Sequence, residues 1–193
     1  MPTDSRPTHR RGAAVQVTVL DTVIELLSEL GYGFSIDEVA NRAGVHKTTI
    51  YRNWTTKPQL VAAAISRFAA RDIVVRRSYD PVADLVGLAE EVGAALRTPT
   101  GSNALRSIVA AAADDPELVA TAERFLAGRY QLAAEVIEAA QAAGTIRSDV
   151  DPLVLWQTMV NPLHLRAILG HPADSATTRT VIEQVLHGAL PRS

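Results

Sequence analysis

One 23-residue stretch that begins at Ser35, SIDEVANRAGVHKTTIYRNWTTK, constrains the fold of this chain more than any other. Ser35 followed three residues later by Glu38 is a capping box, which marks a helix start because each side chain satisfies a backbone N–H group. Gly44 is placed to end that helix, since glycine adopts the left-handed backbone conformation without steric cost. A second helix of about two turns follows, with Ile50 and Trp54 four residues apart on one face. The stretch therefore predicts two short helices joined by a tight turn.

The outward face of the second helix offers hydrogen-bond donors and no acidic group. Its members are His46, Lys47, Thr48, Thr49, Tyr51 and Arg52. Such a helix suits a DNA major groove, which lies between two rows of phosphates. We predict that Lys47, Thr48 and Thr49 approach base edges. The remaining predicted DNA contacts, mostly to phosphates, are Ser35, Arg42, Tyr51, Thr56 and Lys57. Thr56 with Gln59 forms a second capping box, and Lys57 lies in the first turn of the next helix, where free N–H groups attract phosphate.

At these residues the chain closely resembles the tetracycline-repressor (TetR) family of transcriptional regulators. The matching positions are Val39-Ala40, Ala43-Gly44-Val45, Thr49-Ile50-Tyr51, Trp54 and Lys57. Two positions depart from the family pattern: His46 stands where Ser is usual, and Trp54 where Phe is commoner. Because His is a poor N-cap, we expect His46 either to weaken the second helix slightly or to add a DNA contact.

Composition favours an all-α fold. The chain has 193 residues, is 47% hydrophobic and only 5% aromatic, and alanine dominates the apolar fraction. Alanine-rich, aromatic-poor chains prefer helices to strands. The absence of Cys excludes disulfides and thiolate chemistry. The apolar runs are too short for a membrane helix, and the N-terminus lacks a secretory signal, so we predict a cytoplasmic location and no membrane partner.

Charge divides the chain in two. Residues 1–77 hold eleven Lys and Arg against seven Asp and Glu, whereas residues 78–193 hold eight against fourteen. A basic front and an acidic rear fit a DNA-binding part joined to a part that avoids DNA, although chance variation in surface charge is the simpler alternative. We predict a flexible basic arm (1–12), a helix-turn-helix DNA-binding domain called the head (13–56), and a linking helix plus helical domain called the body (57–193).

Helical spacing and caps predict where the elements lie. The head should hold helices at 13–30, 35–43 and 46–52, followed by a linking helix at 57–76. Asp80-Pro81, Asp115-Pro116 and Asp151-Pro152 each place an N-cap Asp before a Pro at the first helical position. These pairs predict helices at 81–97, 116–143 and 152–169, with two more at 101–113 and 176–188. We expect Gly128 to mark close packing by a neighbour, and Pro162 to kink its helix and open a cavity.

The last two predicted helices are apolar on more than one side. In proteins that this chain resembles, these helices pair with their twofold mates, and two heads about 34–36 Å apart read successive major grooves. We therefore predict a homodimer and a palindromic DNA operator, while burial of both faces within one chain remains the alternative. The predicted interface residues are Trp156, Met159, Val160, Leu163, Val181, Ile182, Val185 and Leu186.

The resemblance also implies a small-molecule pocket in the body. Polar and aromatic side chains within apolar helices are its best candidates. They are Phe125, Arg129, Tyr130, Trp156, Met159, Asn161 and His164. An ordinary core role is the alternative for Phe125 and Trp156.

Two hypotheses of function follow. The chain is a homodimeric repressor that a small molecule releases from DNA, or it is a ligand-insensitive DNA-binding or architectural protein whose body only dimerises. We predict no enzyme and no catalytic residue, because the nucleophile, phosphate-loop and dinucleotide signatures are missing. We also predict no cofactor and no metal site, since His164 and His171 have no acidic residue at ligand spacing.

Overall fold

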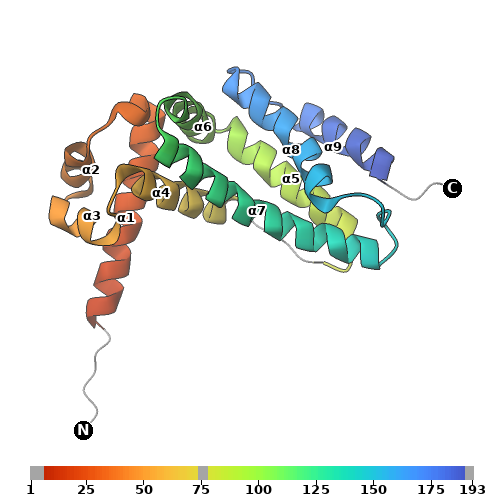
Figure 1. Ribbon diagram of the computed structural model, residues 1–193, viewed down its shortest axis with the longest axis horizontal. Helices are drawn as coiled ribbons and strands as arrows, with labels where there is room; N and C mark the ends of the chain where they lie inside the picture. The colour runs from red at the N-terminus through yellow and green to blue at the C-terminus, as the bar shows by residue number, and fades with distance from the viewer. Residues whose placement is uncertain (1–6, 74–77, 190–193) are drawn as a thin grey trace, which may run out of the picture.

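The computed structural model describes residues 7–73 and 78–189, and this part of the chain is helical without a strand. Figure 1 shows the head helices at one end of an elongated molecule and the body helices beside them. The elements are α1 (Pro7–Leu30), η1 (Gly31–Gly33), α2 (Ile36–Ala43), α3 (Lys47–Asn53), α4 (Lys57–Asp72), α5 (Pro81–Arg97), α6 (Pro99–Ala112), α7 (Pro116–Ala142), α8 (Pro152–Ile168) and α9 (Ser175–Ala189). The predicted all-α architecture is confirmed.

The three Asp-Pro pairs begin helices as predicted. Asp80 accepts hydrogen bonds from the backbone N–H groups of Val82 and Ala83, each at 3.0 Å. Asp115 and Asp151 do the same for residues three positions on, at 3.0 and 2.9 Å. Each carboxylate satisfies donors that the helix itself leaves free, and the following Pro has no N–H group to satisfy.

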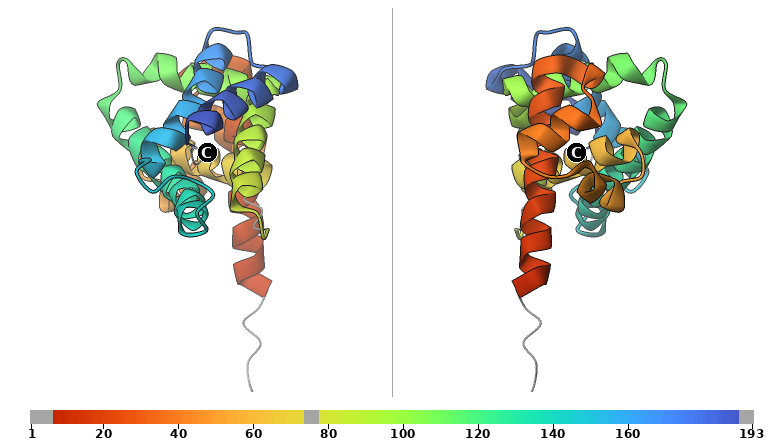
Figure 2. Two further views of the ribbon diagram at one scale, coloured as in Figure 1. Left: turned by 90° about the vertical axis from the view of Figure 1, so that its right-hand side faces the viewer. Right: turned by 90° about the vertical axis from the view of Figure 1, so that its left-hand side faces the viewer.

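Three helix boundaries differ from the prediction. Helix α1 begins at Pro7, so residues 7–12 are helical and project past the head (Figures 1 and 2); residues 1–6 of the predicted arm lie outside the described part. Helix α4 ends at Asp72, and residues 74–76 of the predicted helix lie outside the described part. Helix α6 begins at Pro99 because Thr98 caps it, its hydroxyl oxygen accepting from the Gly101 N–H group at 3.0 Å.

Two hydrophobic cores organise the described residues. The head core joins α1, α2, α3 and the first half of α4, and it also takes Ala104 from α6 and Leu118 from α7. The body core joins α5, α8, α9 and the second half of α7. Because two body helices complete the head core, the head and the body pack directly on each other in addition to being linked by α4.

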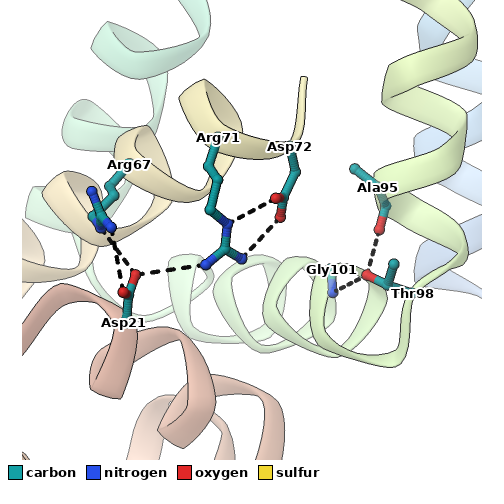
Figure 3. A network of polar contacts seen from close by, with 7 residues as sticks. All are labelled: Asp21, Arg67, Arg71, Asp72, Ala95, Thr98 and Gly101. Atoms are coloured by element: carbon teal, nitrogen blue, oxygen red, sulfur yellow. Dashed lines mark hydrogen bonds and ion pairs between the residues drawn. The ribbon is translucent and has the colours of Figure 1, made fainter. Parts of the chain in front are cut away.

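A cluster of charges fastens α1 to α4 beside the boundary between the cores (Figure 3). Asp21 on α1 receives Arg67 at 3.0 Å and Arg71 at 3.9 Å, and Arg71 also pairs with Asp72 at 2.8 Å. Single exposed pairs contribute little, about 0–1 kcal/mol, but a shared carboxylate makes this a network. It holds the linking helix against the first helix of the head.

Close helix packing occurs at glycines other than the one predicted. A Cβ atom on Gly128 would meet nothing within 4 Å, so the prediction of a close neighbour there is wrong. A Cβ atom on Gly93 of α5 would lie 2.8 Å from Thr178 of α9, and one on Gly101 would lie 2.2 Å from the Ala95 carbonyl oxygen. The tight contacts are therefore the α5–α9 crossing and the α5–α6 corner, which Figure 3 shows at Thr98 and Gly101.

Candidate nucleic-acid interface

The turn between α2 and α3 is built by its caps. The Glu38 N–H group donates to the Ser35 hydroxyl oxygen at 3.2 Å, and the Ser35 N–H group donates to the Glu38 carboxylate at 2.6 Å. This second bond lowers the pKa of Glu38. Gly44 takes the left-handed conformation, with φ at 66°. Because the Ser35 hydroxyl also bonds Glu38, Ser35 serves as a cap here, and its predicted DNA contact finds no free hydroxyl.

Helix α3 presents most of the predicted DNA-contacting residues to solvent. Ile50 is buried in the head core. Thr48 and Arg52 lie two residues before and after it, about 160° away around the helix, and point outward. Tyr51 flanks them and is 51% exposed, while Thr49 is half-buried on the other flank. His46 stands at the N-cap without a side-chain cap bond, as its poor capping ability predicts.

Two of the predicted basic contacts form ion pairs at the surface. Lys47 pairs with Asp37 at 2.5 Å, and Arg42 pairs with Glu29 at 2.6 Å. The bond to Glu29 raises the pKa of Arg42. Exposed pairs of this kind contribute about 0–1 kcal/mol, so a phosphate can replace either carboxylate at small cost.

A groove of about 420 Å³ runs between α1 and α3. Gln16 and Asn53 help to form it and were not among the residues predicted from the sequence. The Gln16 amide donates to the Asn53 side-chain oxygen at 2.7 Å, and the Asn53 amide donates to the Thr49 carbonyl oxygen at 2.7 Å. Gln16 lies on the polar face of α1, which is the signal that could have identified it. The bond between Gln16 and Asn53 holds the C-terminal end of α3 against α1.

A direct phosphate contact requires the Lys57 ammonium group to point toward solvent. In this structure the group points into the protein instead. Its ammonium group donates to the carbonyl oxygens of Tyr32 and Phe34, the latter at 2.6 Å. It also lies 4.2 and 4.3 Å from the ring centroids of the same two residues. Burial lowers the pKa of Lys57. In this geometry Lys57 joins α4 to η1 and to Phe34 just after it, and its phosphate contact stays a prediction.

The start of α4 is also tied to the body. The Thr56 hydroxyl donates to the Glu117 carboxylate of α7 at 2.7 Å, so this predicted phosphate contact is likewise occupied. The Tyr32 hydroxyl donates to the Asp115 carboxylate at 3.2 Å, and burial, with this neighbour, raises the pKa of Tyr32. Of the predicted second capping box, Thr56 accepts from the Gln59 N–H group, but the Gln59 side chain bonds Thr55 instead. A polar junction thus links α4, η1 and α7.

Comparison with known proteins identifies this arrangement. A family model described as "Bacterial regulatory proteins, tetR family" matches residues 19–64, and one described as "Tetracyclin repressor-like, C-terminal domain" matches residues 78–185. The chain belongs to the TetR family. It is therefore a DNA-binding transcriptional regulator, and its relatives are regulators rather than enzymes.

Individual TetR-family proteins resemble the chain, two of them over nearly its whole length and one over the head alone. The regulator AqdR of Rhodococcus erythropolis is 28% identical over 182 residues, which cover 92% of this chain and 86% of AqdR. A repressor TetR of Mycobacteroides abscessus is 41% identical over 56 residues, 28% of this chain and 30% of that repressor. The solved structure of the regulator SCO0332 superposes with a TM-score of 0.76 at 28% identity, covering 92% of this chain and 99% of that one.

The TetR-like body contains a cavity of about 290 Å³ between the two cores, which we call the central cavity. Helices α1, α4, α5, α6, α7 and α8 all line it, with Ile24, Phe68, Leu96, Leu105, Tyr130 and His164 among the contributing residues. Tyr130, Asn161 and His164, three of the predicted ligand residues, come together in its wall. Asn161 and His164 flank Pro162, through which α8 continues as a helix.

The other predicted ligand residues fall outside the central cavity or outside the described side chains. Trp156 lines an adjoining space of about 70 Å³, and Met159 is fully buried in the body core. The prediction of Met159 as a pocket wall is therefore wrong. Phe125 and Arg129 belong to α7, but their side chains are not among those described. The described residues contain no cluster of potential metal ligands and no helix long and apolar enough to cross a membrane.

Most of the predicted dimer residues are buried within a single chain of this TetR-family protein. Six of them belong to the body core, where they are at most 6% exposed: Trp156, Met159, Val160, Leu163, Ile182 and Leu186. The alternative of burial within one chain therefore holds for these six residues, while Val181 and Val185 remain partly accessible. The apolar surface of α8 lies on its other side, where Val154, Leu165 and Leu169 are 57–64% exposed.

Proposed function

We propose that this TetR-family regulator is a homodimeric repressor, and that a small molecule in the central cavity releases it from its operator. The observation that carries the proposal is the position of the cavity between the head core and the body core. Ile24 of α1 and Ile65 and Phe68 of α4 form part of its wall. Helix α1 bonds α3 through Gln16 and Asn53, and α4 follows α3 in the chain. An occupant of the cavity therefore touches two helices that are connected to the DNA-contacting helix. The relative that is called a repressor supports the direction of control.

On DNA, α3 provides the direct contacts. Thr48 and Arg52 point away from the head core and face base edges, with Lys47 and Thr49 beside them. Tyr51 and Arg42 bind phosphates from the flanks. Lys57 and Thr56 act indirectly, since the bonds of Lys57 to Tyr32 and Phe34 and the bond of Thr56 to α7 set the position of the start of α4.

Ligand binding changes the balance between two arrangements of the head. A ligand can shift this balance only by binding one arrangement better than the other. In the arrangement described, the polar junction of Tyr32, Lys57, Asp115 and Glu117 holds the start of α4 against α7. A ligand that presses on Ile65 and Phe68 tilts α4 about this fixed end, and so changes the spacing of the two α3 helices in the dimer.

The apolar stripe on α8 is the proposed dimer contact. Val154, Leu165 and Leu169 follow one another at helical spacings along one face, with Thr158 and Asn161 between them. Three large apolar side chains in one exposed row favour burial against a second copy. A twofold dimer would place the same stripe on both partners.

Selection of bound DNA from a random pool tests the function. We expect wild-type protein to enrich a palindrome with half-sites about one helical turn apart. The variant Leu165→Arg should lose the palindrome because it places a charge in the dimer contact. The matched control Gln184→Arg, on the exposed side of α9, should keep it. Absence of any enrichment would contradict the proposed operator binding. A palindrome that Leu165→Arg retains would contradict only the dimer contact.

A further inference from the structure

We propose that the central cavity takes an uncharged, mainly apolar small molecule whose single hydrogen-bonding group is held between Tyr130 and His164. This inference rests on the proposed function, because it assigns a ligand class to the same cavity. It rests on three observations: the apolar lining of the cavity, the two polar side chains that reach it from α7 and α8, and the further spaces beside them.

The described lining residues carry no formal charge. Apolar side chains from α1, α4, α5, α6 and α7 make up most of the wall, and the polar side chains among the described lining residues are Tyr130, Asn161 and His164. Of these, Asn161 is exposed and lies at the mouth. An ionised ligand would therefore lose its hydration on entering the cavity and would meet no opposite charge among the described wall residues, which is strongly unfavourable. An uncharged ligand does not carry this cost.

Tyr130 and His164 offer a donor and an acceptor from two different helices. Burial lowers the pKa of His164, so its ring is neutral and carries a single N–H group. The other ring nitrogen is then an acceptor. Burial raises the pKa of Tyr130, which keeps its hydroxyl protonated and able to donate. This pair fits a hydroxyl, amine or amide group that both donates and accepts.

The space around the pair is extended rather than round. Tyr130 and His164 also line the adjoining space of about 70 Å³, and a further space of about 140 Å³ lies along α6 and α7. Leu126 borders all three spaces. The three spaces therefore adjoin along one leucine side chain, and the cavity suits an elongated or multi-ring molecule near the small end of ligand size.

Two fluorescent probes of the same shape test the ligand class. N-phenylnaphthylamine is uncharged and carries one N–H group, whereas anilinonaphthalenesulfonate adds a sulfonate to the same ring system. Titration of the full chain should show one site per protomer for the uncharged probe. The sulfonate should bind at least about tenfold more weakly, because its charge finds no partner.

Variants locate the probe and test the polar pair. His164→Leu should weaken the uncharged probe about three- to tenfold, since one hydrogen bond is lost. The control His171→Leu changes an exposed histidine outside the cavity and should have no effect. Leu105→Trp fills the cavity and should abolish probe binding, with circular dichroism confirming that the variant folds. His164→Arg adds a cation and should reverse the preference toward the sulfonate.

The outcomes separate this inference from the proposed function. Equal or tighter binding of the sulfonate in the wild-type protein, abolished by Leu105→Trp, would overturn the ligand class. Binding of neither probe, or binding that Leu105→Trp leaves unchanged, would overturn the cavity as the site. Selective binding of the uncharged probe without any change in operator affinity would support the ligand class and count against ligand release. Failure to bind any operator would count against the proposed function alone.

Discussion

The two hydrophobic cores differ in how they are closed. The head core is sealed by residues that come from elsewhere in the chain, since Ala104 and Leu118 of the body complete it. The body core packs α5, α7, α8 and α9 tightly but leaves the central cavity where it meets the head. The space for a ligand therefore lies at the boundary between two packing arrangements. Because both cores contribute to the cavity walls, a ligand in the cavity contacts both of them. Its binding can therefore affect the head without a hinge between the head and the body.

The largest expected effect comes from removing the body's contribution to the head core. Leu118→Ala should lower the free energy of unfolding by about 2–5 kcal/mol, as for other buried leucines. It should also weaken operator binding, because the head core supports α3. The control Val119→Ala changes the neighbouring, 37% exposed side chain and should cost less than about 1 kcal/mol. Chemical denaturation measures both. Equal effects of the two variants would show that the head core closes without α7.

The corner between the cores should be the next most sensitive position. Gly101→Ala places a Cβ atom 2.2 Å from the Ala95 carbonyl oxygen, so the corner of α5 and α6 must shift. We expect a loss of about 1–3 kcal/mol in denaturation experiments, as for overpacked cores. The control Gly128→Ala meets open space in a helix interior and should stabilise the protein by about 0.5–1 kcal/mol. A neutral Gly101→Ala would show that the corner is not rigid.

The third prediction separates supporting residues from DNA-contacting ones. Lys57→Met removes the bonds to the carbonyl oxygens of Tyr32 and Phe34 and should cost about 1–2 kcal/mol of stability. It should leave the salt dependence of operator binding unchanged, because Lys57 does not reach a phosphate in this geometry. Arg42→Gln removes an exposed cation that we assign to a phosphate, and it should reduce that salt dependence by about one unit. A reduced salt slope for Lys57→Met would mean that the lysine turns outward on DNA.

Sequence patterns predicted most of the helices because their starts are local signals. The Asp-Pro pairs and the Ser35–Glu38 box act over three or four residues. The same kind of signal at Thr98-Pro99 was missed, which misplaced the start of α6. The position of Lys57 could not be predicted, since its partners lie 23 and 25 residues away. Nor could the buried side of α8, because both of its sides are apolar and only the tertiary packing decides between them.

The smallest expected effect addresses the two roles left open for His46. The backbone of this residue already has the extended conformation of an N-cap, but its side chain makes no cap bond. His46→Ser should therefore stabilise the protein by about 0.5–1 kcal/mol, because Ser can accept a hydrogen bond from the first turn of α3. Thermal unfolding measures the gain. An unchanged operator affinity would leave capping as the only role, whereas weaker binding would reveal a DNA contact by the histidine.

The measurement that tests the central claim most directly compares the effect of operator on the affinity of the cavity for a probe with the effect of the probe on operator affinity. The affinity of N-phenylnaphthylamine would be measured with and without saturating operator, and operator affinity with and without saturating probe. Coupling requires the same factor in both directions. We predict that the operator weakens probe binding by the factor by which the probe weakens operator binding. If the probe fills the cavity equally well in both states, occupation of the space between the cores does not control DNA binding.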